Sequence, residues 1–471
     1  MKTLQISLCL AGLLISLSQA ETKAMGSAGE VYDGWRLGIQ CWTLKNGTLF
    51  EAIDQAAALG LKWIEAFPGQ PISPQMKEGF DPDISDQLRR LVRQKLDETG
   101  VGLKTFGVYG MPDDQAGARK VFEFAKAMGI ETIVSEPSFE AFEMLDRLCQ
   151  EYKIRLAIHN HPKPTRYWDP QIAYAICQKT SSWIGVCPDT GHWVRSGLDP
   201  VESLRKFEGR IFDVHLKEIE DNKDLIWGQG KNHVQAALEE LHRQGYKGPI
   251  IIEYEHHWDE DFIPDLSRCI GFYTQAAAGL ASSAWADVFE SDLSNAALKP
   301  NSWQMENGLL IRKGGGDIWT KKEYKDFILD FDFKVEKGTN SGVFLRAAEY
   351  TWLPWAEVQI MDSWENKTVD RQDTCGAIYD IQAPLVNAVN PAGQWNRMTI
   401  QALGPRILVV LNGQLMIDIN LDDWTEAHKN PDGSKNKFDL AYKDLPRKGF
   451  LGFQDHGFAV EYRNLKIKEL N

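Results

Sequence analysis

The stretch Pro188-Asp189-Thr190-Gly191-His192-Trp193 places a carboxylate and an imidazole three residues apart, directly after a short apolar run. Three similar groups lie nearby, each at the end of an apolar run and before a helix-like segment: His159-Asn160-His161, Asp213-Val214-His215-Leu216-Lys217 and Glu253-Tyr254-Glu255-His256. We expect the four groups to converge at one end of a barrel of parallel strands and to hold one metal ion there.

Residues 35–279 alternate strand-like runs with amphipathic helical patterns, at intervals of roughly 25 to 40 residues. Eight runs have the length and composition of strands: Arg36–Trp42, Leu61–Ala66, Val101–Gly107, Ile130–Ser135, Ile154–Ile158, Trp183–Cys187, Arg210–Leu216 and Pro249–Tyr254. This number of strand-helix units predicts a (β/α)8 TIM barrel rather than a doubly wound sheet, which usually has fewer strands.

The alternation of side chains along the later strands supports the expected convergence. Strand side chains point to opposite faces in turn. When the chemically active residue of each strand points inward, its apolar neighbours point outward toward the helices, and this holds for His159, Asp189, His215 and Glu253. A buried polar residue at one strand end is as often structural as functional, but agreement across four strands favours a site.

The sequence pattern changes after residue 279. Residues 280–284 are small and polar and are expected to form a linker. From Trp303 onward, short strands alternate with Gly and Asn turns, and Asn412-Gly413 between two apolar runs predicts a hairpin. Residues 285–471 therefore predict an all-β jelly-roll sandwich.

Length and the first residues add expectations about organisation and location. A chain of 471 residues agrees with two domains, because one hydrophobic core seldom grows beyond roughly 250 to 300 residues. Residues 1–20 have the charge, apolar run and small-residue end of a secretory signal peptide, and residues 21–34 would form an N-terminal extension. We expect export across the inner membrane to the periplasm; a lipoprotein anchor at Cys9 is less favoured because Leu10 follows it.

Charge, hydropathy and cysteine content exclude several classes of protein. The net charge of -14 disfavours binding to a nucleic acid, which needs clustered Lys and Arg. After the signal sequence no run approaches the roughly 18 apolar residues of a membrane span. The six cysteines after Cys9 are too sparse for a disulfide scaffold, although an exported protein could hold one or two disulfides. The sequence does not determine the oligomeric state.

The expected barrel cluster has the composition of a transition-metal site. Two imidazoles and two carboxylates, from His159, Asp189, His215 and Glu253, suit a divalent transition metal better than Mg or Ca, which prefer oxygen ligands. We expect Mn first, with Co, Fe or Zn as alternatives. Such an ion would polarise a sugar carbonyl and make the proton beside it easier to remove.

Residues 35–279 resemble the sugar phosphate isomerase/epimerase family, the xylose isomerase-like TIM barrels. The motifs that carry the resemblance are Asp189-Thr190-Gly191-His192, Val214-His215-Leu216-Lys217 and Ile251-Ile252-Glu253. The resemblance implies that Asp189, His215 and Glu253 are metal ligands and that His192 contacts substrate or metal.

The sequence departs from that family at the end of the fifth strand, where the family commonly has a glutamate and this chain has His159. Ketose epimerases of this kind pair that glutamate with the one on the eighth strand as acid and base, so two-base epimerisation is in doubt. His159 can still bind a metal. Glu253, His161 or His192 would act as the base, since imidazole titrates near neutral pH.

Four further side chains are expected near the same end of the barrel. Glu136 and Glu65 are inward carboxylates at the ends of the fourth and second strands, and each would act in catalysis or hydrogen-bond to the substrate. Lys217 and Trp193 adjoin the ligand motifs and are expected to contact substrate, with core packing as the alternative for Trp193.

The second domain resembles the 3-keto-disaccharide hydrolase family, a concanavalin-like sandwich. The motifs are Gly316-Asp317-Ile318-Trp319, the run from Gly338 to Arg346, Glu357-Val358-Gln359-Ile360-Met361-Asp362, Gly376-Ala377-Ile378-Tyr379, Gln394-Trp395-Asn396 and Gln454-Asp455-His456-Gly457. The residues expected to bind a sugar are Asn340, Arg346, Glu357, Gln359, Asp362 and His456. The alternatives are a buried polar network containing an Arg346–Glu357 salt bridge, or a noncatalytic carbohydrate-binding module.

The two resemblances point to one kind of substrate. A glycoside oxidised at C3 has an acidic C2 proton, so a base can remove it and expel the C1 substituent by β-elimination, after which water adds to give a free 3-keto sugar. We therefore predict an exported enzyme that cleaves 3-keto-glycosides. The alternatives are a metal-dependent sugar isomerase or epimerase with a carbohydrate-binding sandwich, and a noncatalytic sugar-binding protein.

Overall fold

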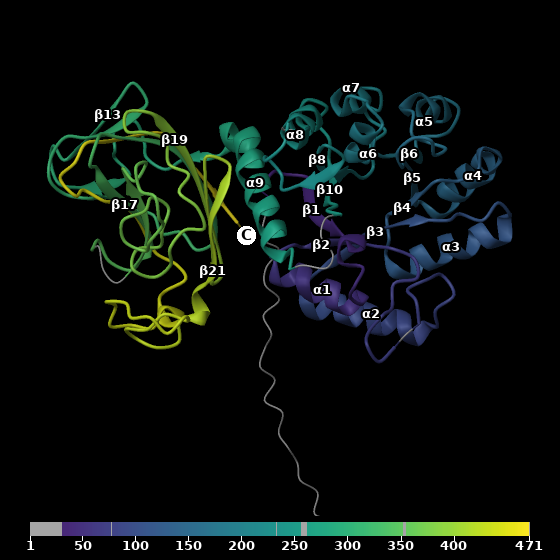
Figure 1. Cartoon of the computed structure of the whole chain (residues 1–471), viewed down its shortest axis with the longest axis horizontal. Coiled ribbons are helices and arrows are strands. Elements are labelled where there is room, and N and C mark those ends of the chain that lie inside the picture. The colour runs from purple at the N-terminus through teal and green to yellow at the C-terminus, as the bar shows by residue number, and fades with distance from the viewer. Residues whose placement is uncertain (1–30, 77, 232, 256–260, 352–354, 471) are drawn as a thin grey trace, which may run out of the picture.

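The computed structural model describes residues 31–76, 78–231, 233–255, 261–351 and 355–470. They form two domains side by side, with helix α9 (Ile263–Ala281) between them, as Figure 1 shows. The predicted signal peptide and residues 21–30 of the predicted extension lie outside the described residues. Within the described parts, no helix is both long and apolar enough to cross a membrane.

Parallel strands form the first domain, in the order β6-β5-β4-β3-β2-β1-β10-β7. Their bounds are β1 (Trp35–Gln40), β2 (Trp63–Ala66), β3 (Gly102–Tyr109), β4 (Thr132–Ser135), β5 (Arg155–His159), β6 (Ile184–Cys187), β7 (His215–Leu216) and β10 (Gly248–Ile252). Parallel bridges from Val186 to Ile211 and from Asp189 to His215 join β6 to β7, so the sheet closes into a barrel. All the predicted strands are confirmed, although β7 is much shorter than the predicted range Arg210–Leu216.

Helices connect the strands and cover the barrel. They are α1 (Leu49–Ala58), α2 (Asp86–Thr99), α3 (Gln115–Met128), α4 (Phe142–Tyr152), α5 (Pro170–Cys177), α6 (Thr190–Arg195), α7 (Pro200–Arg205), α8 (His233–Arg243) and α9, with short 3-10 turns at Cys41–Leu44 and Phe139–Ala141. Local sequence sets their ends: Thr48 and Glu51 form a capping box at α1, and Gly100 ends α2 in the left-handed conformation (φ 69°). All residues of β4, β6 and β10 are buried, as expected for strands covered on both faces.

A small antiparallel hairpin, which the sequence analysis did not predict, follows β7. Its strands are β8 (Glu218–Glu220) and β9 (Lys223–Leu225). Asp221 and Asn222 form the turn with positive φ values of 50° and 62°, a conformation that Asn and Asp tolerate better than most residues.

The second domain is a sandwich of two antiparallel sheets, as predicted. One sheet contains β13 (Trp303–Glu306), β14 (Leu309–Arg312), β23 (Val460–Glu469), β16 (Phe327–Val335), β19 (Trp395–Leu403), β20 (Arg406–Leu411) and β21 (Gln414–Asn420), with β11 (Ala286–Asp287) paired to β23. The other contains β12 (Ala296–Leu298), β15 (Ile318–Thr320), β22 (Phe450–Phe453), β17 (Asn340–Ala347) and β18 (Ala356–Met361). Short 3-10 turns lie at Leu421–Asp423 and Tyr442–Asp444.

Two details of the sandwich follow from its sequence. Phe331 of one sheet and Phe453 of the other meet in the core between the sheets, with ring centroids 6.0 Å apart. The predicted hairpin at Asn412-Gly413 is confirmed, because Leu411 pairs with Gln414 and both turn residues have positive φ (51° and 81°). The cysteines of the described residues are all free and buried, so no disulfide braces either domain there.

Helix α9 joins the two domains into one packed body. Gln275 of α9 is 6% exposed; its Nε2 donates to Thr399 Oγ1 (3.1 Å) and to the Val410 carbonyl (3.3 Å), and its Oε1 accepts from Gly413 N (2.6 Å). Several apolar residues of the sandwich belong to the barrel's hydrophobic cluster: Ile328, Leu408, Val410 and Leu415. The predicted linker, residues 280–284, coincides with the end of α9 and a 3-10 turn at Ser282–Ala284.

This junction gives a stability prediction. Gln275→Leu removes hydrogen bonds that lie between the domains and leaves buried polar groups of the sandwich unpaired, so the free energy of unfolding should fall by about 2 kcal/mol. Unfolding in urea measures this free energy for the variant and for the unaltered protein. Gln178→Leu, at an exposed position after α5, is the matched control and should change the value by less than about 0.5 kcal/mol. An equal effect of both substitutions would show that the Gln275 contacts do not stabilise the junction.

Candidate functional site

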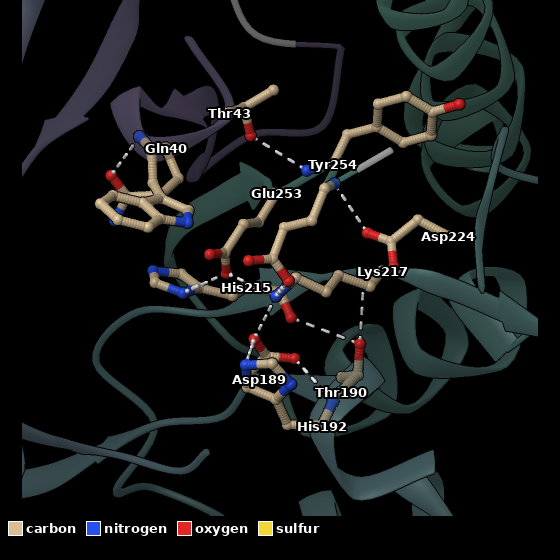
Figure 2. A network of polar contacts seen from close by, with 12 residues as sticks. Gln40, Thr43, Asp189, Thr190, His192, His215, Lys217, Asp224, Glu253 and Tyr254 are labelled. Atoms are coloured by element: carbon tan, nitrogen blue, oxygen red, sulfur yellow. Dashed lines mark hydrogen bonds and ion pairs between the residues drawn. The ribbon is translucent and has the colours of Figure 1, made fainter. Parts of the chain in front are cut away.

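The barrel brings together the four residues predicted to bind a metal. His159, Asp189, His215 and Glu253 each offer a ligand atom, and these atoms lie within 4.8 Å of one another. All four side chains are buried. They come from the carboxyl ends of adjacent strands, β5, β6, β7 and β10, and Figure 2 shows Asp189, His215 and Glu253 meeting at one point.

The donor atoms of this cluster fit a metal ion. His159 Nε2, His215 Nδ1 and Glu253 Oε2 are buried and have no hydrogen-bond partner among the described residues. His215 Nδ1 and Glu253 Oε2 lie 2.9 Å apart, but not in hydrogen-bonding geometry. Buried donor atoms that face one another without partners would be satisfied by a divalent ion with imidazole and carboxylate ligands.

Asp189 is held so that one oxygen faces this cluster. It is the N-cap of α6, and its Oδ1 accepts from His192 N at 2.8 Å. The side chain of Asn160 bonds to both the N–H and the carbonyl of Asp189, at 3.0 Å each. Burial alone would raise the pKa of Asp189, but His192, Lys217 and His159 hold it well below its usual range. The carboxylate therefore stays ionised, with Oδ2 facing the cluster and the Lys217 ammonium.

Lys217 is buried and pairs with the carboxylates of Asp189, Glu253 and Glu255. Its side chain is fully buried, with Nζ 2.8 Å from Asp189 Oδ2, 3.2 Å from Glu253 Oε2 and 2.7 Å from Glu255 Oε2. Burial lowers the pKa of Lys217, but these carboxylates raise it above its usual value, so the ammonium stays charged. Lys217 is therefore a counter-ion of the cluster, and its contact with a substrate stays a prediction.

Glu136 orients His159. Its Oε1 lies 3.0 Å from His159 Nδ1, which directs His159 Nε2 into the cluster, and 2.6 Å from His161 Nδ1. Burial would raise the pKa of Glu136, but the two imidazoles lower it to about 2. Glu136, predicted as a catalyst or substrate contact, is thus an ionised positioning group for both histidines.

The two candidate imidazole bases differ in exposure. The His161 side chain is 45% exposed, whereas that of His192 is 9% exposed. His192 Nε2 lies 3.2 Å from Asp189 Oδ2 and its Nδ1 lies 3.2 Å from Arg195, and burial lowers the pKa of His192 to about 2. His161 is therefore the more accessible imidazole of the pair.

Two residues predicted to contact substrate are buried. Glu65 is fully buried inside the barrel, where it accepts from Gln40 Nε2 (2.8 Å) and lies 3.1 Å from His215 Nε2, so it orients His215. Trp193 is 2% exposed and stacks on Phe207, with ring centroids 6.3 Å apart. Trp193 follows His192 by one residue, which turns the side chain by about 100° around the axis of α6. The Trp193 side chain therefore points into the hydrophobic core.

Part of this network was not predicted from the sequence. Glu255 lies 3.3 Å from Arg195, which also pairs with Asp224 on β9, and the Glu255 N–H donates to Asp224 Oδ2 at 2.8 Å. Glu255 follows Glu253 by two residues and would face the same side of a strand, so this pattern could have predicted it. No pattern predicted Asp224, because the hairpin that carries Asp224 was not predicted.

A second candidate site is a pocket of about 370 Å³ on the sandwich. The described residues that line it are Asp317, Asn340, Glu357, Gln359, Tyr379, Lys437, Gln454, Asp455 and His456. Four of the six predicted sugar-binding residues are present. Glu357 and Gln359 lie on one face of β18, opposite Phe344 and Gly342 of β17. The other lining residues belong to the motifs quoted above, except Lys437, which no motif or periodic pattern predicted.

Arg346 and Asp362 do not line this pocket, contrary to the prediction. The guanidinium of Arg346 donates to the carbonyls of Lys325 and Gly404 (2.6 Å each) and pairs with Asp326, not with Glu357. A register shift after Phe344 and a positive φ of 53° at Arg346 turn its side chain away. Asp362 instead caps a turn, because its Oδ2 accepts from Gly338 N at 2.9 Å.

Glu357 has an unusual environment in the pocket. Burial raises its pKa to about 8, although Lys437 partly opposes the shift. Gly342 makes room for the carboxyl group, because a Cβ at that position would lie 2.2 Å from Glu357 Oε1. The pocket therefore holds a carboxyl group that titrates close to neutral pH.

The position of Glu136 leads to a prediction about metal affinity. Glu136→Gln leaves all four ligands in place but weakens the bond that orients His159, so Mn²⁺ should bind about 10- to 100-fold more weakly in calorimetry. Glu140→Gln, an exposed neighbour, is the control and should bind Mn²⁺ like the unaltered protein. Equal affinities for the two variants would contradict the orienting role.

The pKa of Glu357 predicts how stability depends on pH. Between the ordinary pKa of 4.5 and the raised value of about 8, the native state holds a proton that the unfolded state has lost. This contribution to the free energy of unfolding is present in full below pH 4.5 and is lost as the pH rises to about 8. Glu357→Gln should remove that slope in urea titrations across this range, and the exposed Glu349→Gln should keep it. Parallel slopes for Glu357→Gln and the unaltered protein would refute the assignment.

Two family descriptions match consecutive parts of the chain. "Xylose isomerase-like TIM barrel" matches residues 53–270, and "3-keto-alpha-glucoside-1,2-lyase-like domain" matches residues 283–468. The 3-keto-disaccharide hydrolase of Bacteroides thetaiotaomicron is 26% identical over 207 residues, which cover 36% of this chain and 71% of that protein. Inosose dehydratase of Clostridium tetani is 31% identical over 94 residues, which cover 20% of this chain and 32% of that protein. The chain thus spans about a third of the length of this second relative.

Solved structures resemble each domain. A candidate glycosyl hydrolase of Parabacteroides distasonis is 36% identical, covers 40% of this chain and 99% of its own, and has a TM-score of 0.38. An uncharacterised protein of the same species is 31% identical, covers 53% of this chain and 99% of its own, and has a TM-score of 0.44. Residues 53–270 are thus similar to the xylose isomerase-like TIM barrel family, and residues 283–468 to the 3-keto-alpha-glucoside-1,2-lyase-like domain family.

Proposed function

We propose that this protein is an exported, periplasmic enzyme that cleaves 3-keto-glycosides by C2 proton abstraction, β-elimination and hydration. The observation that carries the proposal is the presence, on one chain, of a four-donor barrel cluster and a separate polar sandwich pocket. The names of two relatives, a 3-keto-disaccharide hydrolase and an inosose dehydratase, support a keto-sugar substrate and elimination chemistry. Export rests on the sequence of residues 1–20.

The barrel cluster suits the first step, in which the C2 proton is removed. A divalent transition metal, Mn²⁺ before Co, Fe or Zn, would supply Lewis-acid polarisation of the 3-keto oxygen when held by His159, Asp189, His215 and Glu253. The chain supplies the base. The His161 side chain is 45% exposed, and its Nδ1 lies 2.6 Å from Glu136 Oε1. Its other ring nitrogen, Nε2, would therefore accept the proton.

Glu136 completes this acid-base pair. Because its pKa is held low, it remains a carboxylate and stabilises the imidazolium that forms when His161 accepts the C2 proton. The electron pair of the C2–H bond then forms the C1–C2 double bond, and the C1 substituent leaves with its bonding electrons. Water adds to this double bond to give the free 3-keto sugar.

A second candidate function is that of a sugar isomerase or epimerase whose sandwich only binds carbohydrate. The match of residues 53–270 to the xylose isomerase-like family favours it. His159 in place of a fifth-strand glutamate argues against the two-base epimerase reaction, because that position then lacks the carboxylate base.

A chromogenic 3-keto-glucoside tests the proposal. The full chain with Mn²⁺ should release the chromophore, and a chelator should remove the metal-dependent part of the rate. His161→Ala should lower that part about 10²- to 10⁴-fold without loss of Mn²⁺ binding. His428→Ala, at an exposed position in the sandwich, is the control. Intact 3-keto-glucoside together with epimerisation of a free ketose would instead establish the second candidate.

A further inference from the structure

A cavity of about 540 Å³ lies where the barrel, the end of α9 and the sandwich meet. Residues from all three parts line it, among them Tyr32, His242, Lys247, Trp285, Lys322 and Lys468. Tyr32 precedes β1 and Lys247 precedes β10, so the cavity adjoins the amino ends of the strands, whereas the metal-binding cluster lies at their carboxyl ends. Ligand pockets commonly have volumes of about 300 to 1,000 Å³ and often lie at domain interfaces. The cavity therefore has the size and position of a further ligand site, which the proposed reaction does not use.

The cavity has an excess of positive charge. Among the described lining residues, Lys247, Lys322 and Lys468 are basic, and Asp33 and Glu469 are acidic. Lys468 Nζ lies 2.6 Å from Asp33 Oδ1, and Lys322 pairs with Glu469. Within the described parts of the chain, no ion pair joins Lys247 to a carboxylate. The Lys247 ammonium therefore carries the charge that these two carboxylates do not neutralise, in a chain whose net charge is -14.

The segment that precedes β1 holds the Lys247 side chain in place. This side chain crosses Gly34, where a Cβ would lie 2.2 Å from Lys247 Cδ, so the glycine makes room for it. Lys247 Nζ donates to the Asp33 carbonyl and lies 5.1 Å from the centroid of the Tyr32 ring, a cation–π contact. Because an ammonium has three N–H donors, Lys247 keeps donors for an anion in the cavity.

Aromatic rings form the apolar part of the lining. Tyr32 stacks on Trp35, with ring centroids 4.1 Å apart, and the Tyr32 hydroxyl lies 2.6 Å from His242 Nδ1. Trp285 packs against the barrel's hydrophobic cluster and remains partly exposed where it lines the cavity. An aromatic face packs well on the C–H face of a sugar ring, and an ammonium binds a carboxylate through charge-assisted hydrogen bonds. The lining thus suits a molecule that combines a sugar ring with a carboxylate.

We propose that this interdomain cavity is a noncatalytic binding site for an acidic sugar, whose carboxylate pairs with Lys247 and whose ring packs on Trp285. A neutral sugar would leave the ammonium without an anion, and an inorganic anion would leave the aromatic face uncovered. The site does not depend on the 3-keto-glycoside reaction, because it lies at the other end of the barrel from the metal-binding cluster. Since residues of both domains line the cavity, a bound sugar would contact both domains and stabilise their junction.

Calorimetry with sodium D-glucuronate on the full chain tests this site. D-glucuronate should bind, and D-glucose, which lacks the carboxylate, should bind at least about 10-fold more weakly. Lys247→Met and Trp285→Ala should each weaken the binding of D-glucuronate about 10- to 100-fold. Lys179→Met, at an exposed position after α5, is the matched control and should bind like the unaltered protein. Excess chelator should leave the affinity unchanged, because the barrel metal takes no part.

Further outcomes distinguish this site from its alternatives. Lys247→Arg keeps the charge, so it should retain part of the binding, which would show that Lys247→Met loses a contact and not the fold. Absence of D-glucuronate binding, equal affinity for D-glucose, or unimpaired binding by Lys247→Met would overturn the proposal. Inorganic phosphate that binds as tightly as D-glucuronate, with no effect of Trp285→Ala, would identify a simple anion site and overturn the sugar assignment.

Discussion

The barrel site depends on the neutralisation of buried carboxylates. Asp189 and Glu253 are almost fully buried, and burial of an ionised carboxylate costs several kcal/mol unless a cation pairs with it. The Lys217 ammonium contacts both residues (Figure 2), but His159 Nε2 and His215 Nδ1 have no hydrogen-bond partner among the described residues. One ammonium therefore stabilises this group of side chains only in part, and a divalent ion would satisfy the remaining atoms.

The stretch from Asp189 to His192 is built around this constraint. Asp189 Oδ1 caps α6, and Asp189 Oδ2 faces Lys217 and the cluster. Thr190 Oγ1 accepts from the N–H of Lys217 at 3.2 Å, and a Cβ at Gly191 would lie 2.6 Å from Lys217 Cβ. Thr190 and Gly191 thus position the segment between β7 and β8 that carries Lys217, and His192 lies beside Asp189. The short motif is explained by contacts with a segment more than twenty residues away.

The sequence predicted what depends on periodicity and on strand parity. The barrel, the sandwich and the convergence of four donor residues follow from patterns of two or 3.6 residues, and the hairpin follows from the Asn412-Gly413 turn. The sequence was less informative where a local irregularity or packing decides. A register shift turned Arg346 away from its expected face, Trp193 stacks on Phe207, and Glu65 points inward but is fully buried. Lys437 reaches its pocket from a loop, and loops carry no periodic signal.

His159 stands at the position of a family glutamate and would complete a metal site with Asp189, His215 and Glu253. Anomalous X-ray diffraction from crystals soaked in Mn²⁺ tests this assignment. We expect one strong anomalous peak within bonding distance of His159 Nε2, Asp189 Oδ2, His215 Nδ1 and Glu253. A peak beside Glu136 and His161 instead, or no peak at the ends of β5, β6, β7 and β10, would rule this site out.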